Sequence, residues 1–337
     1  MAARWHAGHL ISDPTIAVTR PELPGDSLRV LRQRATIEAF PEKRPLEERE
    51  LIALVDGAHA LICQSSDRIT AAVVDAAPRL EIVSTVSVGF DHLDLAALNA
   101  AGILATNTPG VLTETTADMA WALILAARRR VVEGDRLVHG GGWIAEGFEL
   151  LPALDVHGAT LGIVGMGAVG QAVARRAQGF AMEVLYHSRS FVPGVPFERV
   201  SLEELLRRSD IVTLHVALNA ETRGLIGERE LGLMKPSSVL VNTSRGRVLD
   251  QVALTHALAD HRIAAAGLDV TATEPITADD PILHLPNCIV LPHIASATVK
   301  TRATMADLAV EAVGAVIDGM LPSHVINSEI VEEAPHK

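Results

Sequence analysis

The chain has 337 residues, of which 48% are hydrophobic and 21% charged, a balance typical of a globular protein whose length favours two domains. Its formal net charge of −12 disfavours nucleic acid and anionic membrane surfaces as partners. No run approaches the roughly 18 apolar residues of a spanning helix, and Cys63 and Cys288 have neither metal-ligand nor disulfide spacing, so we expect a cytoplasmic protein without a structural metal.

The first third of the chain predicts a small α/β domain. The first dozen residues, which lack an apolar signal core, are interpreted as a loose extension. β-branched segments then alternate with helical stretches and predict parallel strands at 15–19, 35–40, 60–64, 80–86 and 103–107. A long helix is predicted over 113–130, with Thr115 and Asp118 spaced as a capping box, and we expect it to connect two domains.

A second alternation follows a glycine-rich segment at 140–143. Strands are predicted at 161–164, 183–187, 211–215, 239–242, 264–270 and 289–291, and a last helix at 301–319. The expected fold is α/β, with two Rossmann-like or flavodoxin-like domains, doubly wound parallel sheets and an active-site cleft between the domains. We expect a discontinuous substrate-binding domain, 1–108 plus 301–337, and an NAD(P)-binding Rossmann domain, 109–300.

A glycine fingerprint lies between an apolar strand and a helical run. Gly165, Gly167 and Gly170 fit the G-x-G-x-x-G pattern, with Ala168 and Val169 at the predicted start of the helix. Such a loop turns tightly and lets backbone N–H groups approach a pyrophosphate beside the positive end of the helix. The motif in this context predicts dinucleotide binding, the alternative being a glycine-rich turn without a ligand.

The second strand of this alternation is expected to end in an acid when the cofactor is NAD, because the acid binds the ribose 2′-hydroxyl. Here it is followed by Ser188, Arg189 and Ser190, and no acid occurs from Val184 to Phe197. A guanidinium and hydroxyls suit a 2′-phosphate. The sequence therefore favours NADP(H), with NAD(H) as the alternative if Arg189 is only a solvated loop cation.

Three polar residues each follow a later predicted strand: Arg245, Glu274 and His293. Because the carboxyl ends of parallel strands share one edge, an anion binder, an acid and an imidazole converge on the expected nicotinamide site. Each also has a structural interpretation, as an interdomain ion pair, a turn cap before Pro275 and a core histidine. His215 is a rival acid, although its apolar surroundings favour packing beside the cofactor.

These motifs together resemble the D-isomer-specific 2-hydroxyacid dehydrogenases, and most of all the glyoxylate/hydroxypyruvate reductases among them. The resemblance covers nearly the whole chain after the N-terminal extension. It is carried by the segments 87–92 (SVGFDH), 107–111 (NTPGV), 165–170 (GMGAVG), 242–246 (NTSRG), 267–275 (GLDVTATEP) and 291–298 (LPHIASAT). One departure is Ala295, where a glycine is common in this motif; its methyl group is expected to tighten the pocket beside His293.

The resemblance implies specific roles for residues of this chain. The expected catalytic residues are Arg245, Glu274 and His293. The expected substrate-binding residues are Arg245, Ser296, Trp143 and the backbone amides of Val88 and Gly89. The expected cofactor contacts, besides the glycine fingerprint and 188–190, are Val216, Thr243, Ser244 and Asp269. A homodimer is also implied, in which the segment that carries Trp143 crosses to the partner, although a tryptophan by itself is more often a packing residue.

The expected reaction is NADPH-dependent, reversible reduction of small 2-oxo acids such as glyoxylate and hydroxypyruvate to glycolate and D-glycerate. His293 would serve as acid and base, and Glu274 would favour its protonated form. One alternative is an NAD-dependent D-2-hydroxyacid dehydrogenase for another, bulkier or inorganic substrate. The other is a non-enzymatic NAD(H)-sensing binding protein, although little sequence follows the last predicted helix to serve as an interaction tail.

Overall fold

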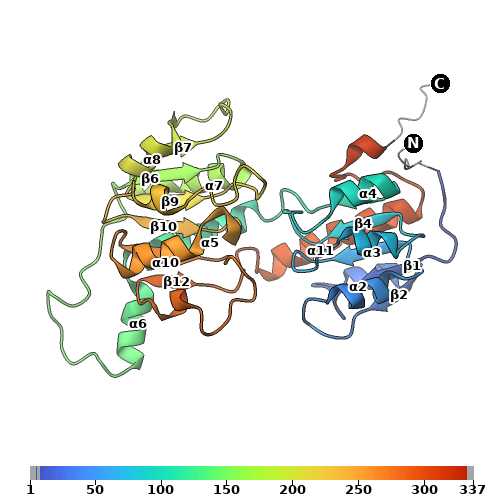
Figure 1. Ribbon diagram of the computed structural model, residues 1–337, viewed down its shortest axis with the longest axis horizontal. Coiled ribbons are helices and arrows are strands. Elements are labelled where there is room, and N and C mark those ends of the chain that lie inside the picture. Colours follow the sequence, from blue (N-terminus) through green and yellow to red (C-terminus); the bar gives the residue numbers. More distant parts are fainter. Residues whose placement is uncertain (1–4, 6–7, 332–337) are drawn as a thin grey trace. The chain divides into compact units, whose positions relative to one another are not determined.

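The computed structural model describes residue 5 and residues 8–331, and it separates into two compact units (Figure 1). Unit 1 contains the residues up to Leu112 and those from Ala297 onward, and unit 2 is Thr113–Ser296. The division expected from sequence, at 108/109 and 300/301, lies four residues from each of these bounds. The assignment of unit 1 to substrate binding stays a prediction.

Unit 1 is built on a five-stranded sheet in which every paired strand is parallel and the order is β2-β1-β3-β4-β5. The strands are β1 Thr15–Val18, β2 Thr36–Ala39, β3 Ala60–Cys63, β4 Ile82–Thr85 and β5 Leu104–Thr106. Each lies inside its predicted segment. Strands β3, β4 and β5 are buried along their whole length, whereas the edge strand β2 is not. This burial is typical of a parallel sheet that is covered on both faces.

The helices of unit 1 are α1 Ser27–Leu31, α2 Glu48–Val55, α3 Ala71–Asp75, α4 Leu95–Ala101 and α11 Val299–Ile317, with a 3₁₀ turn at Ser328–Ile330. Helix α11 begins two residues before its predicted start, where the Thr298 side chain accepts a hydrogen bond from the Thr301 backbone. It packs against α1, β3 and β4. The chain beyond it returns to the sheet, because the backbone of Ile326 donates to Ala105 at 2.7 Å.

The N-terminal segment is not the loose extension that the sequence suggested. The backbone of Trp5 donates to Ile330, and its indole is buried in the same hydrophobic cluster as α11. Gly8 and Ile11 make further backbone hydrogen bonds with the end of α11 and the turn after it. Burial of the Trp5 indole stabilises the packing of this segment against unit 1. A single buried side chain leaves no strand or helix periodicity in the sequence, so the packing was not predicted. Residues 1–4 and 6–7 lie outside the described residues.

Unit 2 contains a seven-stranded parallel sheet with the order β12-β11-β10-β9-β6-β7-β8. The strands are β6 Thr160–Val164, β7 Glu183–His187, β8 Glu198–Arg199, β9 Ile211–Leu214, β10 Val239–Asn242, β11 Ala265–Leu268 and β12 Cys288–Val290. The exposed edge strand β8 was not predicted, because two polar residues give no periodic signal. The chain reverses its direction of travel across the sheet between β6 and β9, and doubly wound sheets bind ligands at such a point. The predicted α/β fold class is confirmed.

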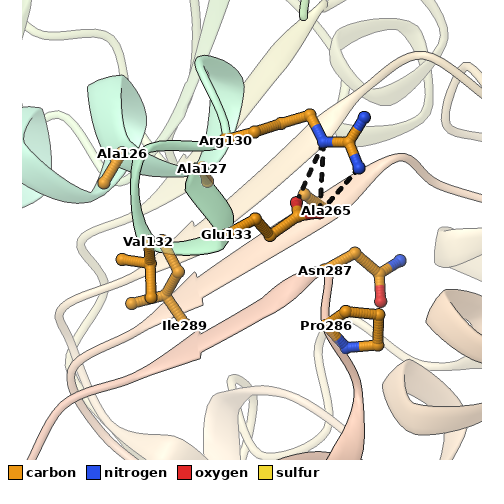
Figure 2. Close-up of a pocket in the computed structure, with 9 residues that line it drawn as sticks. All are labelled: Ala126, Ala127, Arg130, Val132, Glu133, Ala265, Pro286, Asn287 and Ile289. Atoms are coloured by element: carbon orange, nitrogen blue, oxygen red, sulfur yellow. Dashed lines mark hydrogen bonds and ion pairs between the residues drawn. The ribbon is translucent and has the colours of Figure 1, made fainter. Parts of the chain in front are cut away.

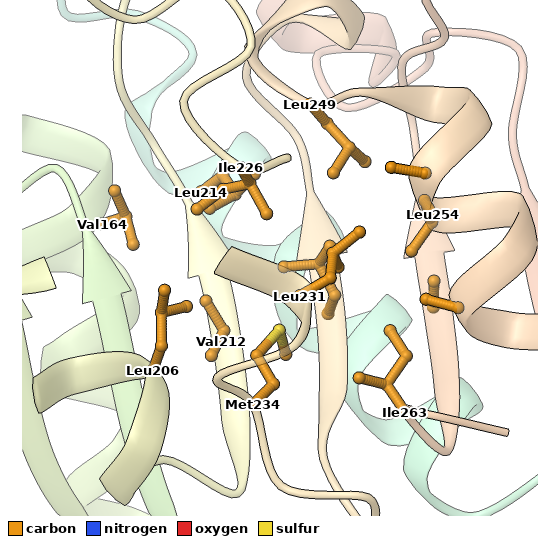
Figure 3. Close-up of a cluster of buried hydrophobic side chains, with 14 of the residues drawn as sticks. Val164, Leu206, Val212, Leu214, Ile226, Leu231, Met234, Leu249, Leu254 and Ile263 are labelled. Carbon is orange, nitrogen blue, oxygen red and sulfur yellow. The ribbon is translucent and has the colours of Figure 1, made fainter. Parts of the chain in front are cut away.

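Helices cover both faces of this sheet. They are α5 Thr113–Arg128, α6 Val131–His139, α7 Ala168–Ala177, α8 Leu202–Arg208, α9 Glu228–Leu231 and α10 Gln251–Ala259, with 3₁₀ turns at Gln178–Phe180, Gly246–Val248 and Pro281–His284. Figure 3 shows aliphatic side chains of the sheet meeting Leu206 of α8, Leu231 of α9 and Leu254 of α10. Helices α5 and α7 pack on the other face. No helix of the described residues is long and apolar enough to cross a membrane.

The predicted helix 113–130 is divided in the structure. Because α5 already begins at Thr113, Thr115 lies within it and the predicted capping box is wrong; Asp118 instead pairs with Arg176 at 2.7 Å. The helix ends at Arg128, and Arg130 adopts a left-handed conformation from which α6 begins. The buried guanidinium of Arg128 donates to the carbonyls of Asp155, Asp210 and Ser237, so it is held by tertiary contacts.

Candidate functional site

The three glycines of the fingerprint have different surroundings between β6 and α7. Gly165 has a φ of 101°, and an added Cβ would lie 2.6 Å from the carbonyl oxygen of His215 and 2.9 Å from Val216. At Gly170 an added Cβ would lie 2.1 Å from the carbonyl oxygen of Gly165, so this glycine allows α7 to pack against β6. At Gly167 it would meet no described atom within 4 Å. The open face at Gly167 therefore fits the close approach of a pyrophosphate.

The loop after β7 carries the residues expected to select the cofactor. The carbonyl of His187, the last residue of β7, accepts a hydrogen bond from Gly165, so this loop begins beside the glycine fingerprint. The Ser188 hydroxyl donates to the Ser190 carbonyl at 2.6 Å, and the Arg189 guanidinium is exposed. Ser188, Arg189 and Ser190 therefore stand at the carboxyl end of β7, next to the loop in which a dinucleotide is expected.

Two residues from other segments contact this loop, and sequence reasoning missed both. Arg199 of β8 donates to the carbonyls of Ser188 and Arg189, which fixes the course of the loop. Glu221, which lies in the loop after β9, pairs with Arg189 at 3.2 Å. An acid therefore does lie near the position where the adenosine is expected, although it comes from outside the segment in which the dinucleotide pattern places it. Its 32-residue separation from Arg189 left no local signal.

His215 is held in a neutral environment at the end of β9. Its imidazole contacts the Thr213 hydroxyl at 2.9 Å and the Thr243 hydroxyl at 3.4 Å. Burial lowers the pKa of His215 to about 3, so this imidazole is uncharged near neutral pH. Such a group is unsuited to donating a proton as an imidazolium, which weakens it as a rival to His293. Thr243 and Val216 lie beside it, at the ends of neighbouring strands.

Arg245 follows β10 in a loop that a neighbouring glycine brings close to the end of β11. The Asn242 amide donates to the Arg245 carbonyl at 2.9 Å, and its oxygen accepts from the Ser244 backbone and hydroxyl. A Cβ at Gly246 would lie 1.9 Å from the carbonyl oxygen of Thr271, so only glycine permits this approach. The Arg245 charge in turn helps lower the pKa of Glu274.

His293 and Glu274 form a direct pair after β12 and β11. The imidazole Nδ1 lies 2.7 Å from a carboxylate oxygen of Glu274, whose other oxygen accepts from the Thr271 backbone at 3.0 Å. Burial would raise the pKa of Glu274, but the hydrogen bond and the charge of His293 outweigh it and hold the pKa below its usual value. The imidazole is 35% exposed, and Nδ1 is the nitrogen that contacts Glu274.

Asp269 positions the histidine loop. His293 has a φ of 55°, in the left-handed region that costs a non-glycine residue conformational energy. Both oxygens of the buried Asp269 carboxylate accept backbone hydrogen bonds at 2.8 Å, one from Ile294 and one from Ala295, and its own carbonyl accepts from the His293 backbone. These bonds stabilise the loop in its strained conformation. A cofactor contact by Asp269 stays a prediction, as does a substrate contact by Ser296, which is half-buried at the end of the same loop.

Unit 1 carries a second candidate binding element in the loop after β4. The carbonyl of Val88 accepts a hydrogen bond from the Asn107 side chain, and the carbonyl of Gly89 accepts one from the Ser87 hydroxyl. Among the described residues, the backbone N–H groups of Val88 and Gly89 have no partner. Both residues are half-buried. Their amides are therefore available to an anion, and carboxylate binding by Val88 and Gly89 stays a prediction.

Two other features lie away from these residues. A cavity of about 10 Å³ lies beneath the junction of α5 and α6, where Arg130 and Glu133 are ion-paired (Figure 2). Ala265, which begins β11, lines it, so it lies at the amino ends of the strands, opposite the glycine fingerprint, and it holds at most one water molecule. Trp143 lies in the exposed segment after α6. Among the described residues, no group of three metal-ligating side chains occurs.

Comparison with known proteins places the chain among dehydrogenases of one kind. Residues 121–295, more than half of the chain, match the family of the D-isomer specific 2-hydroxyacid dehydrogenase, NAD binding domain. The chain is 46% identical over 327 residues to a glyoxylate reductase of Korarchaeum cryptofilum, a match that covers 96% of this chain and 98% of that protein. It is 43% identical to a glyoxylate reductase of Thermococcus gammatolerans, with 95% and 97% covered.

Solved structures agree with this family. A crystal structure of a Thermus thermophilus protein superposes with a TM-score of 0.88 and 46% identity, covering 93% of this chain and 99% of that one. An NADPH-dependent glyoxylate/hydroxypyruvate reductase of Sinorhizobium meliloti, in complex with NADP and malonate, gives a TM-score of 0.85 at 31% identity and covers 96% and 100%. The chain belongs to the D-isomer specific 2-hydroxyacid dehydrogenase family, and it is an NAD(P)-dependent oxidoreductase.

Proposed function

We propose that this protein reduces small 2-oxo acids, glyoxylate and hydroxypyruvate first among them, to glycolate and D-glycerate, with NADPH as the preferred cofactor. The observation that carries the proposal is the His293–Glu274 pair, in which a partly exposed imidazole is oriented by a carboxylate at 2.7 Å. The pair and the glycine fingerprint follow carboxyl ends of strands in one parallel sheet. The names of the similar relatives support glyoxylate as substrate.

The dinucleotide would be held by the open face at Gly167 and by Thr243 and Ser244, which follow β10. When bound, NADPH supplies the hydride that reduces the substrate carbonyl. The guanidinium of Arg245 binds the substrate carboxylate in unit 2, and the amides of Val88 and Gly89 offer a second pair of donors for a carboxylate in unit 1. Fixing the carboxylate orients the keto carbon, since the two groups are adjacent in a 2-oxo acid.

The protonated His293 donates its Nε2 proton to the carbonyl oxygen of the substrate as negative charge develops there. Glu274 accepts a hydrogen bond from Nδ1, which fixes the orientation of the ring. In the direction of oxidation, the neutral imidazole removes the hydroxyl proton through the same nitrogen. Asp269 acts indirectly, because its two hydrogen bonds hold the loop that carries His293.

The preference for NADPH rests on the loop after β7. A 2′-phosphate would meet the exposed guanidinium of Arg189 and the hydroxyls of Ser188 and Ser190. The existing pair between Arg189 and Glu221 joins side chains that are 81% and 68% exposed, so it is a weak interaction that a dianionic phosphate can displace. The complex of the Sinorhizobium meliloti enzyme with NADP supports this assignment by analogy.

The proposal is tested by mixing purified protein with NADPH and glyoxylate and following absorbance at 340 nm. We expect steady oxidation of NADPH with glyoxylate and with hydroxypyruvate, and slower oxidation when NADH replaces NADPH. Cofactor binding without turnover of either acid would favour a dehydrogenase for a bulkier substrate or a cofactor-sensing binding protein. A larger panel of 2-oxo acids then separates these two.

We also propose that two copies of the chain form a homodimer through α6 and the segment after it. No side chain of α6 is buried, and the segment exposes Trp143, Ile144 and Phe148. Figure 1 shows α6 and this segment extending away from the sheet of unit 2. Large apolar side chains gathered on a protruding segment mark an interaction surface. A second copy is the occupant that the family resemblance implies.

A further inference from the structure

The loop 87–89 of unit 1 is held by hydrogen bonds to its carbonyl oxygens. The backbone N–H of Thr108 donates to the Ser87 carbonyl at 2.9 Å. The side-chain amide of Asn107 donates to the Val88 carbonyl at 2.7 Å. Both donors belong to consecutive residues at the end of β5. Two successive carbonyls of the loop are therefore directed toward the same short segment.

This arrangement fixes where the amide hydrogens point. In a trans peptide unit, the C=O of one residue and the N–H of the next are directed to opposite sides. Because the Ser87 carbonyl faces Thr108, the N–H of Val88 points away from that residue, and because the Val88 carbonyl faces Asn107, the N–H of Gly89 points away likewise. Two successive N–H groups that both point away from that segment lie on the same side of the loop. Such a pair forms a concavity suited to an anion.

A chain of side-chain hydrogen bonds fixes the next peptide unit. The Ser87 hydroxyl donates its one proton to the Gly89 carbonyl at 2.6 Å, so its contact with the Thr85 hydroxyl at 2.9 Å must be one in which Thr85 donates. Thr85 then accepts from Nε2 of His92 at 2.9 Å. The direction of all three bonds follows from the single proton on each hydroxyl. The loop is thus held by hydrogen bonds within unit 1.

Asn107 is itself firmly placed. Its backbone N–H donates to the His324 carbonyl, and the neighbouring Thr106 pairs with Val325 in an antiparallel bridge. The chain after α11 therefore fixes the position from which the Asn107 amide reaches Val88. One of the two side-chain N–H groups is used in this bond.

We propose that Asn107 is a positioning residue that, through its bond to the Val88 carbonyl, holds the N–H groups of Val88 and Gly89 as a preformed carboxylate-binding pair. The inference rests on the proposed function, since it deepens the carboxylate site of that reaction. Asn107 acts on the peptide backbone and not on the substrate. Because these donors are already in place, substrate binding does not include the free-energy cost of ordering the loop. Because the carboxylate is unchanged by the reaction, the contribution is to ground-state and transition-state binding alike.

The test compares wild type with Asn107→Ala in the full chain. We expect the KM for glyoxylate and the dissociation constant for oxamate, a non-reducible 2-oxo acid isostere, to rise about tenfold, while kcat changes less than about threefold. NADPH affinity should be unchanged. The matched control is Asn99→Ala, which removes an asparagine of unit 1 whose side chain bonds to Glu329 and Asn327 instead of to the loop. Its KM should equal that of wild type.

A second measurement separates positioning from direct contact with the substrate. In protein labelled with ¹⁵N-glycine, the Gly89 amide resonance, assigned by its absence in Gly89→Ala, should shift in Asn107→Ala before any ligand is added. An unchanged Gly89 resonance together with a raised KM would overturn the proposal in favour of direct contact, and an unchanged oxamate affinity would overturn it altogether. If wild type neither reduces glyoxylate nor binds oxamate while the resonance still moves, the proposed function fails and the loop-positioning role stands.

Discussion

At the residue scale, the candidate site depends on how each titratable side chain is partnered. His293 and His215 both follow strands of the same sheet, yet their surroundings differ. His293 is paired with a carboxylate and one-third exposed, whereas burial among neutral groups lowers the pKa of His215 to about 3. Of the two, only His293 has a carboxylate partner that orients its ring. The two histidines are therefore expected to contribute very differently to turnover.

We predict that His293→Ala lowers kcat for glyoxylate reduction by about 10²- to 10⁴-fold while dinucleotide binding persists, because the proton donor is lost and the cofactor loop is untouched. Arg245→Ala should lower kcat/KM by a similar factor through loss of carboxylate binding. His284→Ala, an exposed histidine of the same unit, is the control and should retain wild-type rates. Normal turnover in His293→Ala would assign the proton donor elsewhere. Steady-state kinetics and fluorescence titration with NADPH provide the measurements.

Glu274→Gln changes the charge next to His293 without changing its shape. The carboxylate favours the protonated imidazole, and the converse effect appears in Glu274 itself: burial would raise its pKa, but the hydrogen bond and the charge of His293 hold it low. Removing this negative charge should make the imidazole lose its proton at lower pH. We therefore expect the pH above which kcat/KM for reduction declines to be lower in the variant than in wild type. A profile that coincides with wild type would show that the pair does not control protonation.

Arg189 and Glu221 together test cofactor choice. Arg189→Ala should reduce the NADPH over NADH ratio of kcat/KM by about tenfold to a hundredfold, since a charge-assisted bond to the 2′-phosphate is lost. Glu221→Gln should raise the ratio modestly, because it removes a competitor for the guanidinium. The measurements are made at fixed ionic strength. A wild-type ratio below one would refute the NADPH preference, and an unchanged ratio in Arg189→Ala would shift the role to Ser188, Ser190 or backbone groups.

At the element scale, the dinucleotide loop offers a comparison between two glycines of one motif. An alanine at Gly170 would place its Cβ 2.1 Å from the Gly165 carbonyl, whereas at Gly167 the added methyl meets no described atom within 4 Å. We expect Gly170→Ala to lower the free energy of unfolding by about 1–3 kcal/mol or more. Gly167→Ala should unfold like wild type in denaturant but bind NADPH at least tenfold more weakly. Equal stability of the two variants would contradict these separate roles.

The elements themselves were predictable to the extent that their signal is local. Buried parallel strands such as β3 and β10 are short apolar runs, and the glycine fingerprint lies within six consecutive residues. Both features can therefore be predicted from a short stretch of sequence. Contacts between distant segments were not predictable in this way. Asn107 and Val88 are 19 residues apart and Arg189 and Glu221 are 32 apart, and tertiary packing alone brings each pair together. The candidate set of Arg245, Glu274 and His293 could be proposed from sequence because parallel topology gathers strand ends at one edge, a rule that operates beyond local sequence.

At the scale of the whole molecule, the proposed homodimer predicts that the protein in solution has the mass of two chains. Phe148→Asp combined with Ile144→Asp places charge on the two most exposed large apolar side chains of the segment after α6. We expect sedimentation to show a dimer for wild type and a monomer for the double variant, because desolvating two carboxylates opposes association. Val252→Asp, an exposed apolar residue of α10, is the control and should remain dimeric. A monomeric wild type would refute the dimer.

The order of the units along the chain has a consequence for synthesis. Unit 2 is one continuous stretch placed between two parts of unit 1, and α11, which covers β3 and β4, comes after it. During translation, the strands β1 to β5 leave the ribosome first, but the helix that buries one of their faces is made last. Throughout the synthesis of unit 2, the nascent chain therefore lacks the helix that covers one apolar face of this sheet. Unit 2 is continuous and can fold at once. During translation, chaperones are expected to bind the part of unit 1 that has already been made and to be released when α11 emerges.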